Sequence, residues 1–212
     1  MLTVHHLGVS QSERVVWLLE ELGLDYRLIR YDRDPVTRLA PPEYKALYPF
    51  GTAPVLDDGA LRLAESGAII EYLIHTHGGG RLSIGPKDAT YTAYLFWWHF
   101  ANASMVPAAL TDSLVRQLGD GGAPVIQSLR ARHDKAWEMV EARLGEVAYF
   151  AGDALTAADI VMLFPLTTMR LFSGRGISAY PNIQAYLQRI GARPAYQRAM
   201  AKAEPGRTPL LT

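Results

Sequence analysis

The residues that decide the fold are Ala53-Pro54-Val55, followed closely by Ala64-Glu65-Ser66-Gly67-Ala68-Ile69-Ile70. They predict a strand entered through a proline, a tight turn at 57–59, a second short strand and then a helix. Ser66 at a helix start offers a hydroxyl and free backbone N–H groups, which suit a carboxylate. Glu65 offers a negative charge, which suits an ammonium group. The stretch therefore fits the α-amino acid end of a ligand, although the same two residues could simply cap a helix.

Composition narrows the class of protein. The chain has 212 residues, a formal net charge of +0 and 49% hydrophobic residues, which allows one large domain or two small ones. A neutral chain has no general attraction to nucleic acid or to an anionic membrane. The N-terminus does not resemble a signal peptide, and no apolar stretch reaches the ~20 residues needed to span a bilayer. We therefore expect a cytoplasmic protein with neither a nucleic-acid nor a membrane partner.

The chain contains no cysteine. It therefore has no disulfide, no thiolate ligand for a metal and no cysteine nucleophile of its own. His5-His6 and His75-x-His77 have no acidic or cysteine partners at the usual ligand spacings, so we expect no metal site.

The first part of the chain alternates strands and helices. Residues 2–7 and 26–31 predict strands, and apolar residues at helical spacing predict a helix over 12–22 between them. A short helix near 43–47, the hairpin and a helix ending near His75 follow. An early β-α-β order favours two parallel strands with a right-handed crossover, and the hairpin adds an antiparallel pair. We predict a mixed four-stranded sheet covered by helices.

The second part reads as helices only. A glycine-rich segment at 78–86 fits an interdomain linker. Helices are predicted over 91–118 with a kink at Pro107, 125–144 after a break at 119–124, 156–172, 183–190 and 194–203. Thr156 and Asp159 predict a capping box, with Leu155 and Ile160 as a hydrophobic staple. The expected organisation is an α/β domain at 1–78, a linker at 79–86 and an all-helical domain at 87–212.

Three motifs together carry a family resemblance. They are Ser10-x-Ser12-x-Arg14-Val15-x-Trp17-Leu18-Leu19-Glu20-Glu21-Leu22-Gly23, then Tyr48-Pro49-x-Gly51-x-Ala53-Pro54, then Glu65-Ser66-x-Ala68-Ile69. In this order and spacing they resemble the thioredoxin-like domain of cytosolic glutathione transferases. Leu155-Thr156-x-Ala158-Asp159 is similar to the family's folding signature, which is structural. The resemblance covers nearly the whole chain and implies a homodimer that uses glutathione as a co-substrate.

Ser10 and Ser12 lie where thiol chemistry is expected, between the first strand and the first helix. Their hydroxyls can donate to an anion while the helix N-terminus adds positive potential, and both effects favour thiolate over thiol. A free thiol has a pKa of about 8.5, which such sites lower. The resemblance implies that glutathione supplies the thiol. In serine-type members the activating hydroxyl lies four residues before the arginine of the first helix, which is Ser10 here; Ser12 remains the alternative or a helix cap.

The resemblance also implies how glutathione is held. Pro54 should follow a cis peptide bond, with the backbone of Ala53 pairing with the cysteinyl part of the ligand. Glu65 and Ser66 should hold the γ-glutamyl end.

Two positions depart from the family's pattern. Tyr48 stands where asparagine is common, and Thr52 stands near the position where a lysine commonly meets the glycyl carboxylate. Lys45 or Arg33 could serve that carboxylate instead.

The resemblance places a second, apolar substrate between the domains, against the first long helix of the helical domain. We expect Tyr94, Trp98, Asn102 and Met105 to contribute to this site. The implied activity is attack of the glutathione thiol on an apolar electrophile, a detoxification chemistry. A glutathione-dependent disulfide or peroxide reductase and a non-catalytic scaffold on the same fold are the alternatives.

Overall fold

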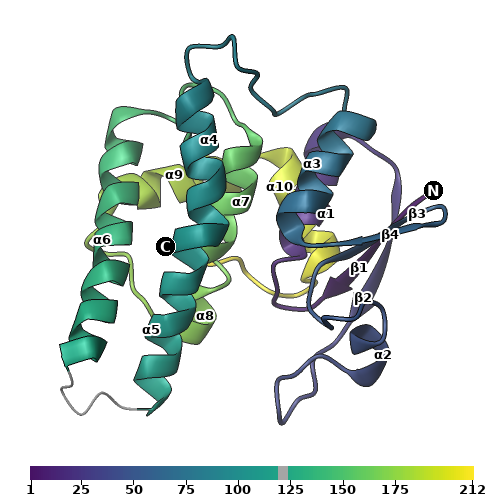
Figure 1. Cartoon of the computed structure of the whole chain (residues 1–212), viewed down its shortest axis with the longest axis horizontal. Helices are drawn as coiled ribbons and strands as arrows, with labels where there is room; N and C mark the ends of the chain where they lie inside the picture. The colour runs from purple at the N-terminus through teal and green to yellow at the C-terminus, as the bar shows by residue number, and fades with distance from the viewer. Residues whose placement is uncertain (119–123) are drawn as a thin grey trace. The chain divides into compact units, whose positions relative to one another are not determined.

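The computed structural model describes residues 1–118 and 124–212 (Figure 1). Its contacts form two units, Met1–Ser83 with Ala192–Pro209, and Ile84–Gly191 with Leu210–Thr212. The domain boundaries 1–78, 79–86 and 87–212 stay predictions; by contacts, residues 192–209 group with the first unit. The predicted fold class, a thioredoxin-like domain with a mixed four-stranded sheet followed by an all-helical domain, is confirmed. No described helix, in 1–118 or 124–212, is both long and apolar enough to cross a membrane.

The sheet has the predicted mixed topology. Its strands are β1 (Leu2–Leu7), β2 (Tyr26–Tyr31), β3 (Val55–Asp58) and β4 (Leu61–Ala64), in the order β2-β1-β3-β4. β1 runs parallel to β2 and antiparallel to β3, which pairs antiparallel with β4. The hairpin turn falls on 59–60 rather than 57–59, because Asp57 and Asp58 still pair with Arg62 and Leu61 across the hairpin. At Gly59 the φ of +60° is one that glycine adopts readily.

Helices cover both faces of this sheet. α1 (Glu13–Leu22) packs against α3 (Ser66–Thr76) and α10 (Pro194–Ala203) on one face. α1 ends where predicted, at a left-handed Gly23 with φ +63°. The short α2 (Pro42–Lys45) lies on the other face, where Tyr44 packs with Leu7 and Val55 (Figure 1). The site loop between β1 and α1 is thereby fixed at both its ends.

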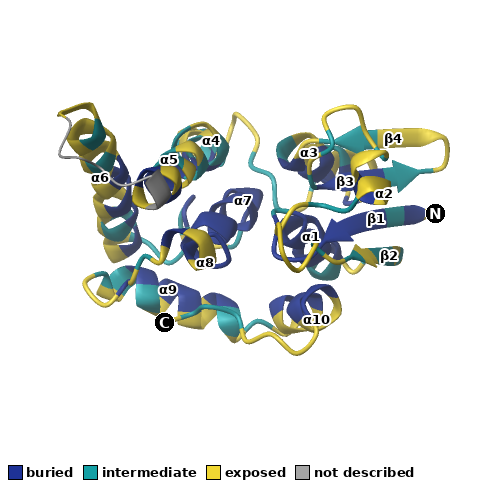
Figure 2. Ribbon diagram, turned by 90° about the horizontal axis from the view of Figure 1, so that it is seen from below, coloured by how far each residue is buried: buried dark blue, intermediate teal, exposed yellow. Residues whose placement is uncertain are grey.

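The second unit consists of helices joined by short connections. These are α4 (Tyr91–Phe100), the π-helical segment η1 (Ala101–Met105), α5 (Val106–Leu118), α6 (Pro124–Glu146), α7 (Ala157–Leu166), α8 (Arg170–Ser173) and α9 (Pro181–Gly191). A break was predicted at 119–124, and residues 119–123 of it lie outside the described residues. α7 is buried along its whole length (Figure 2) and begins with the predicted capping box of Thr156 and Asp159.

Two prolines alter the predicted helices. The helix predicted over 91–118 contains a π-helical segment at 101–105 instead of a simple kink. Pro107 has no N–H to donate to the carbonyl four residues earlier, and its ring crowds that carbonyl. The wider turn of a π-helical segment relieves the crowding and avoids the missing hydrogen bond. The helix predicted to reach Phe172 ends at Leu166, one residue after Pro165 inside the same helix. A separate short helix, α8, follows it.

Candidate active site

The β1–α1 loop brings Ser10 and Ser12 into direct contact. Their Oγ atoms lie 2.7 Å apart, and the Ser10 hydroxyl donates to the carbonyl of Leu7 at 2.7 Å. Ser12 occupies the N-cap position of α1, but its side chain makes no capping bond. Its Oγ instead accepts from the Leu7 N–H at 3.2 Å and lies 2.8 Å from Nδ1 of His6. Ser12 is completely buried, whereas Ser10 retains 5% exposure. Ser10 is therefore the better placed of the two to meet a ligand.

The same loop is held in an unusual backbone conformation. Val9 has a φ of +55°, which is a genuine outlier for a β-branched residue. Arg33 donates from Nε to the Gly8 carbonyl at 2.8 Å and from Nη2 to the Val9 carbonyl at 3.1 Å. Nη1 of Arg33 donates to the Arg38 carbonyl at 3.0 Å. Arg33 is thus engaged in holding the loop, while Lys45 is exposed.

Ala53 and Pro54 lie directly before β3. The peptide bond between them is cis, as predicted. Val55, the next residue, pairs with His5 of β1 and Ala64 of β4, so the cis bond lies directly before the first residue of a central strand. Ala53 is partly buried and Pro54 is buried.

Glu65 and Ser66 stand at the start of α3. Glu65 is exposed and has a φ of +71°, and Ser66 is buried. The Ser66 Oγ accepts from Nη1 of Arg14 at 3.2 Å, and the same nitrogen donates to Oε1 of Gln11 at 2.8 Å. Burial lowers the pKa of Arg14 to about 9, so its guanidinium is still cationic at neutral pH. A buried positive charge behind a helix N-terminus strengthens that terminus as a place for a carboxylate.

Arg14 was not predicted as a site residue. Its place in the Ser10-x-Ser12-x-Arg14 motif was the available signal, because that spacing puts it on the first turn of the helix. His6 and Glu204 were also missed. Nε2 of His6 lies 3.2 Å from Oε1 of Glu204, and both side chains are buried. No local pattern links two residues that are 198 positions apart.

The residues expected to hold an apolar substrate all belong to the second unit. The rings of Tyr94 and Trp98 lie side by side on α4, with centroids 6.0 Å apart. Asn102 is partly buried on η1, and Met105 has 0% exposure, so its side chain has no open surface for a ligand in this structure.

Two open hollows lie along other residues of the same helices. One, of about 350 Å³, is lined by Leu95, Phe96, His99, Phe100, Ala103 and Ser104. The other, of about 260 Å³, shares Phe100 and Ser104 with the first and is otherwise lined by residues of α5 and α6. The two hollows do not include the four predicted residues.

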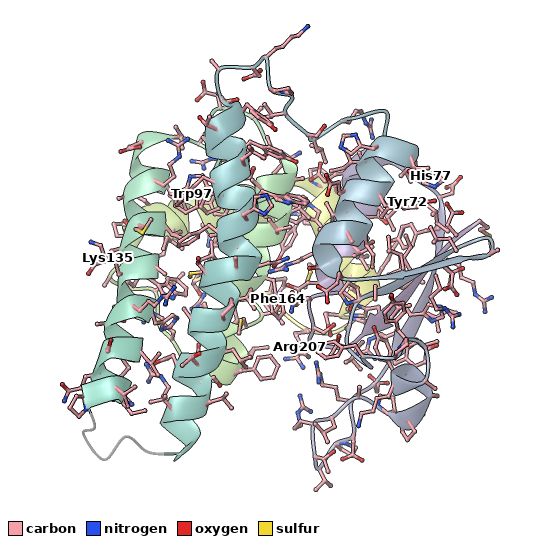
Figure 3. The ribbon with its side chains drawn as sticks, viewed as in Figure 1. Tyr72, His77, Trp97, Lys135, Phe164 and Arg207 are labelled. Carbon is pink, nitrogen blue, oxygen red and sulfur yellow. The ribbon has the colours of Figure 1, made fainter. Side chains whose placement is uncertain are left out.

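The histidine pairs do not gather metal ligands. His5 and His6 point to opposite faces of β1, where His5 contacts Tyr31 and Asp57 and His6 contacts Ser12. Tyr72 of α3 and His77, just beyond α3, are labelled in Figure 3, and both hydrogen-bond to Oδ2 of Asp58. Within residues 1–118 and 124–212, no group of three or more histidine, cysteine or acidic residues is arranged to hold a metal ion.

Comparison with known proteins gives consistent matches. Residues 10–76 match the family model of the glutathione S-transferase N-terminal domain, and residues 96–194 match that of the C-terminal domain. Glutathione S-transferase 3 of Schizosaccharomyces pombe is 31% identical over 96% of this chain and 88% of its own length. A crystal structure of a glutathione S-transferase from Actinobacillus pleuropneumoniae is 39% identical with a TM-score of 0.88, covering 96% of this chain and 93% of that one.

A more distant structure shares the fold. It is a glutathione transferase family member from Pseudomonas fluorescens with two glutathione molecules bound. It is 22% identical with a TM-score of 0.78, and the match covers 94% of this chain and 92% of that one. The two family models together span both units, and a relative above 30% identity matches almost end to end, so the chain belongs to the glutathione S-transferase family.

Proposed function

We propose that this protein is a glutathione transferase that activates the thiol of glutathione at Ser10 for attack on an apolar electrophile. The observation that carries the proposal is the arrangement within the first unit. The Ser10 hydroxyl in the β1–α1 loop, the Ala53-Pro54 segment before β3, and the start of α3 at Glu65 and Ser66 belong to one hydrogen-bonded sheet and its helices. Family membership makes glutathione the natural candidate for a ligand with a thiol and an α-amino acid end.

The start of α3 supplies the grip for the γ-glutamyl end. The exposed carboxylate of Glu65 suits the ammonium group of the ligand. The ligand's carboxylate suits Ser66 and the first N–H groups of the helix, with the charge of Arg14 behind them. The backbone of Ala53 pairs with the cysteinyl part in this proposal, which brings the ligand's sulfur toward the β1–α1 loop.

The chemical step is a substitution. The thiol loses its proton, the sulfur forms a bond to the electrophilic carbon, and the leaving group departs with its bonding electron pair. Donation by the Ser10 hydroxyl and the positive potential at the start of α1 stabilise the thiolate, and holding both reactants lowers the barrier further. In the structure the Ser10 hydroxyl donates to the Leu7 carbonyl, so it must give up that bond before it can donate to the thiolate.

The proposed apolar substrate contacts are Tyr94, Trp98 and Asn102. The rings of the buried Tyr94 and the partly buried Trp98 are tilted by 31° to each other and supply aromatic contacts, and Asn102 places an uncharged amide one turn further along. Met105 belongs to this proposal only as a support for the helix, because it is fully buried.

Calorimetric titration with reduced glutathione tests the grip. We expect saturable binding in the wild type and roughly tenfold or greater weakening in Ser66→Ala and in Glu65→Gln, since a hydrogen bond to a charged group contributes about 1.5–3 kcal/mol. Ser178→Ala, at an exposed serine of the other unit, should bind as the wild type does. Unchanged affinity in both site variants would refute the proposed grip.

A second titration tests the role of Ser10. Ser10→Ala removes the hydroxyl that donates to the thiolate, so it should raise the pKa of the bound thiol by about one unit. That shift corresponds to about 1.36 kcal/mol of lost preference for the anion and is read from the thiolate absorbance of the complex. Ser12→Ala should have the larger effect if Ser12 is the activating hydroxyl. An unchanged curve in Ser10→Ala would remove it from the mechanism.

Parallel activity assays separate the alternatives. An aryl halide reports transferase activity, and a hydroxyethyl disulfide reports a glutathione-dependent reductase. The chain has no cysteine, so the reductase would need a second glutathione to resolve the mixed disulfide. Glutathione binding without either activity would favour a scaffold, and no binding would point to the departures at Tyr48 and Thr52. The homodimer and the cytoplasmic location stay predictions.

A further inference from the structure

A buried chain of polar side chains runs away from the proposed thiol site. From the Ser10 Oγ it passes over 2.7 Å to the Ser12 Oγ and over 2.8 Å to Nδ1 of His6. From Nε2 of His6 it passes over 3.2 Å to Oε1 of Glu204, just beyond α10. All four side chains are buried, and Ser10 at the loop end is the one nearest to solvent among them, at 5% exposure. The chain thus connects the proposed catalytic hydroxyl to a buried imidazole and a buried carboxylate.

The surroundings of Glu204 fix the direction of these hydrogen bonds. Burial acts to raise the pKa of Glu204, but hydrogen bonds from His6 and the Val9 N–H outweigh it and leave that pKa below its usual value. The ionised carboxylate can only accept, so Nε2 of His6 carries a hydrogen. In a neutral imidazole Nδ1 is then an acceptor, and it faces the Ser12 hydroxyl.

We propose that His6 takes up the thiol proton of glutathione through Ser12 and Ser10, while Glu204 orients the imidazole and stabilises its charged form. This inference rests on the proposed function, because it requires a thiol at Ser10. Ser10 alone touches the reacting sulfur; Ser12, His6 and Glu204 act through it as positioning residues. The sequence motif accounts for the two serines, and the fold adds the histidine and the glutamate.

The transfer balances at each atom. The Ser10 hydrogen first turns from the Leu7 carbonyl to the Ser12 Oγ. The S–H bond then breaks and its proton goes to the Ser10 Oγ, whose own hydrogen passes to the Ser12 Oγ. The hydrogen of Ser12 passes to Nδ1 of His6. Each serine ends with one hydrogen, the sulfur becomes a thiolate, and the imidazole becomes an imidazolium beside the Glu204 carboxylate. The hydrogen bonds between the sulfur and Nδ1 of His6 have then reversed, so Ser10 donates to the thiolate, while Nε2 of His6 still donates to Glu204. After the substitution the proton returns by the same path to the leaving group or to water.

Other charged groups face the carboxylate end of this chain. Nη2 of Arg30, from β2, lies 3.7 Å from Oε2 of Glu204, and Nε of Arg207 (labelled in Figure 3) lies 3.9 Å from the same oxygen. Arg33 also interacts electrostatically with Glu204. These cations leave Oε1 to His6 and Val9. Their positive charges also disfavour an imidazolium at His6, so the Glu204 carboxylate is needed to keep the proton on that ring.

Proton counting provides the test. Calorimetry in two buffers with different ionisation enthalpies measures how many protons glutathione releases on binding, and absorbance measures how much thiolate forms. Below the pKa of the free thiol, we expect the wild type to form thiolate with close to no proton release. In His6→Asn the pKa of the bound thiol should rise by about one unit, giving about tenfold less thiolate at a fixed pH. His75→Asn, at an exposed histidine of the same unit, should match the wild type.

Two further measurements guard against a folding defect. S-methylglutathione has no thiol proton and should bind the wild type, His6→Asn and Glu204→Gln equally, which shows that the grip is intact. Nitrogen NMR of the wild-type histidines needs no variant: the His6 ring should become an imidazolium with glutathione and stay neutral with S-methylglutathione.

The failures are distinguishable. If the wild type binds no glutathione or forms no thiolate, the proposed function fails. If the wild type forms thiolate but releases about one proton for each thiolate, or if His6 stays neutral in the complex, only the relay fails. A thiol titration curve in His6→Asn identical to that of the wild type has the same meaning.

Discussion

Asp159 offers a sharp test of the energetics of the helical unit. Its carboxylate has 0% exposure and accepts from the N–H groups of Phe150 and Thr156 at 3.0 and 2.9 Å. It also accepts from the hydroxyls of Thr156 and Tyr186 at 3.1 and 3.2 Å. In Asp159→Asn, an NH₂ group replaces one of the two accepting oxygens. If the amide is oriented to keep the Phe150 bond, the Thr156 N–H is left buried without an acceptor, which costs about 2 kcal/mol.

The cost should depend on pH. Burial raises the pKa of Asp159 from 3.8 to about 6, against the opposing effect of its four hydrogen bonds. Because the folded state binds the proton more tightly, the resulting stabilisation is fully present below the unfolded pKa and is lost as the pH rises through about 6. Between about pH 5 and about pH 7.5 this linkage changes the free energy of unfolding by about 1.4 kcal/mol. The variant lacks the titrating group, so its deficit should be larger at the lower pH by that amount.

Urea unfolding followed by tryptophan fluorescence measures both values. Three of the four tryptophans, at positions 97, 98 and 137, lie in the helical unit, so the signal reports mainly on it. Asp153→Asn, at an exposed aspartate of the preceding loop, is the matched control and should show no such pH dependence. A deficit that shrinks toward low pH would refute the reasoning, because it would mean that the hydrogen bonds outweigh burial and lower the pKa.

Two other predictions concern packing and substrate binding. In Gly78→Ala the new Cβ would lie 2.9 Å from the backbone oxygen of Ile74, so urea unfolding should show a free energy of unfolding lower by about 1–3 kcal/mol. Gly85→Ala is the control: its Cβ meets nothing within 4 Å, so it should change that free energy by less than about 0.5 kcal/mol. Equal effects of the two substitutions would contradict the packing argument. Trp98→Ala should raise KM for an apolar electrophile roughly tenfold, from about 1.4 kcal/mol of lost apolar contact, without changing glutathione affinity. Phe96→Ala, at a neighbouring exposed ring, is its control, and an unchanged KM in Trp98→Ala would exclude Trp98 from the substrate site.

The sequence predicted the fold well where signals are local. The strands at 2–7 and 26–31 and the helix at 194–203 have the predicted bounds, and Gly23 ends α1 as expected. Strands and helices are indicated by apolar residues that recur at short, regular spacings, and a helix end is indicated by a single glycine. Each of these signals spans only a few neighbouring residues, so it can be recognised in the sequence alone. The π-helical segment at 101–105 was not predicted, because the pattern locates Pro107 but not how the backbone relieves it.

The site was predictable to a smaller extent. Ser10, Pro54, Glu65 and Ser66 stand in motifs, and the cis bond before Pro54 was expected from the resemblance. Glu204 stands in no motif, and its proximity to His6 follows only from the packing of α10 against α1. Burial creates the need for such a pairing, since a buried carboxylate without partners is costly, but sequence alone does not say which residues meet.

The strained loop before Ser10 explains why these distant residues matter. A valine at φ +55° persists only if its surroundings hold it there, and both polar atoms of its backbone are held: the N–H by Glu204 and the carbonyl by Arg33. The same carboxylate oxygen that accepts from Val9 also accepts from His6. One group therefore fixes both the backbone that aims the Ser10 hydroxyl and the imidazole that ends the buried chain. In the proposed mechanism, a chain without cysteine depends on how accurately a bound thiol meets that hydroxyl, and a preorganised loop would remove the cost of ordering it at each turnover.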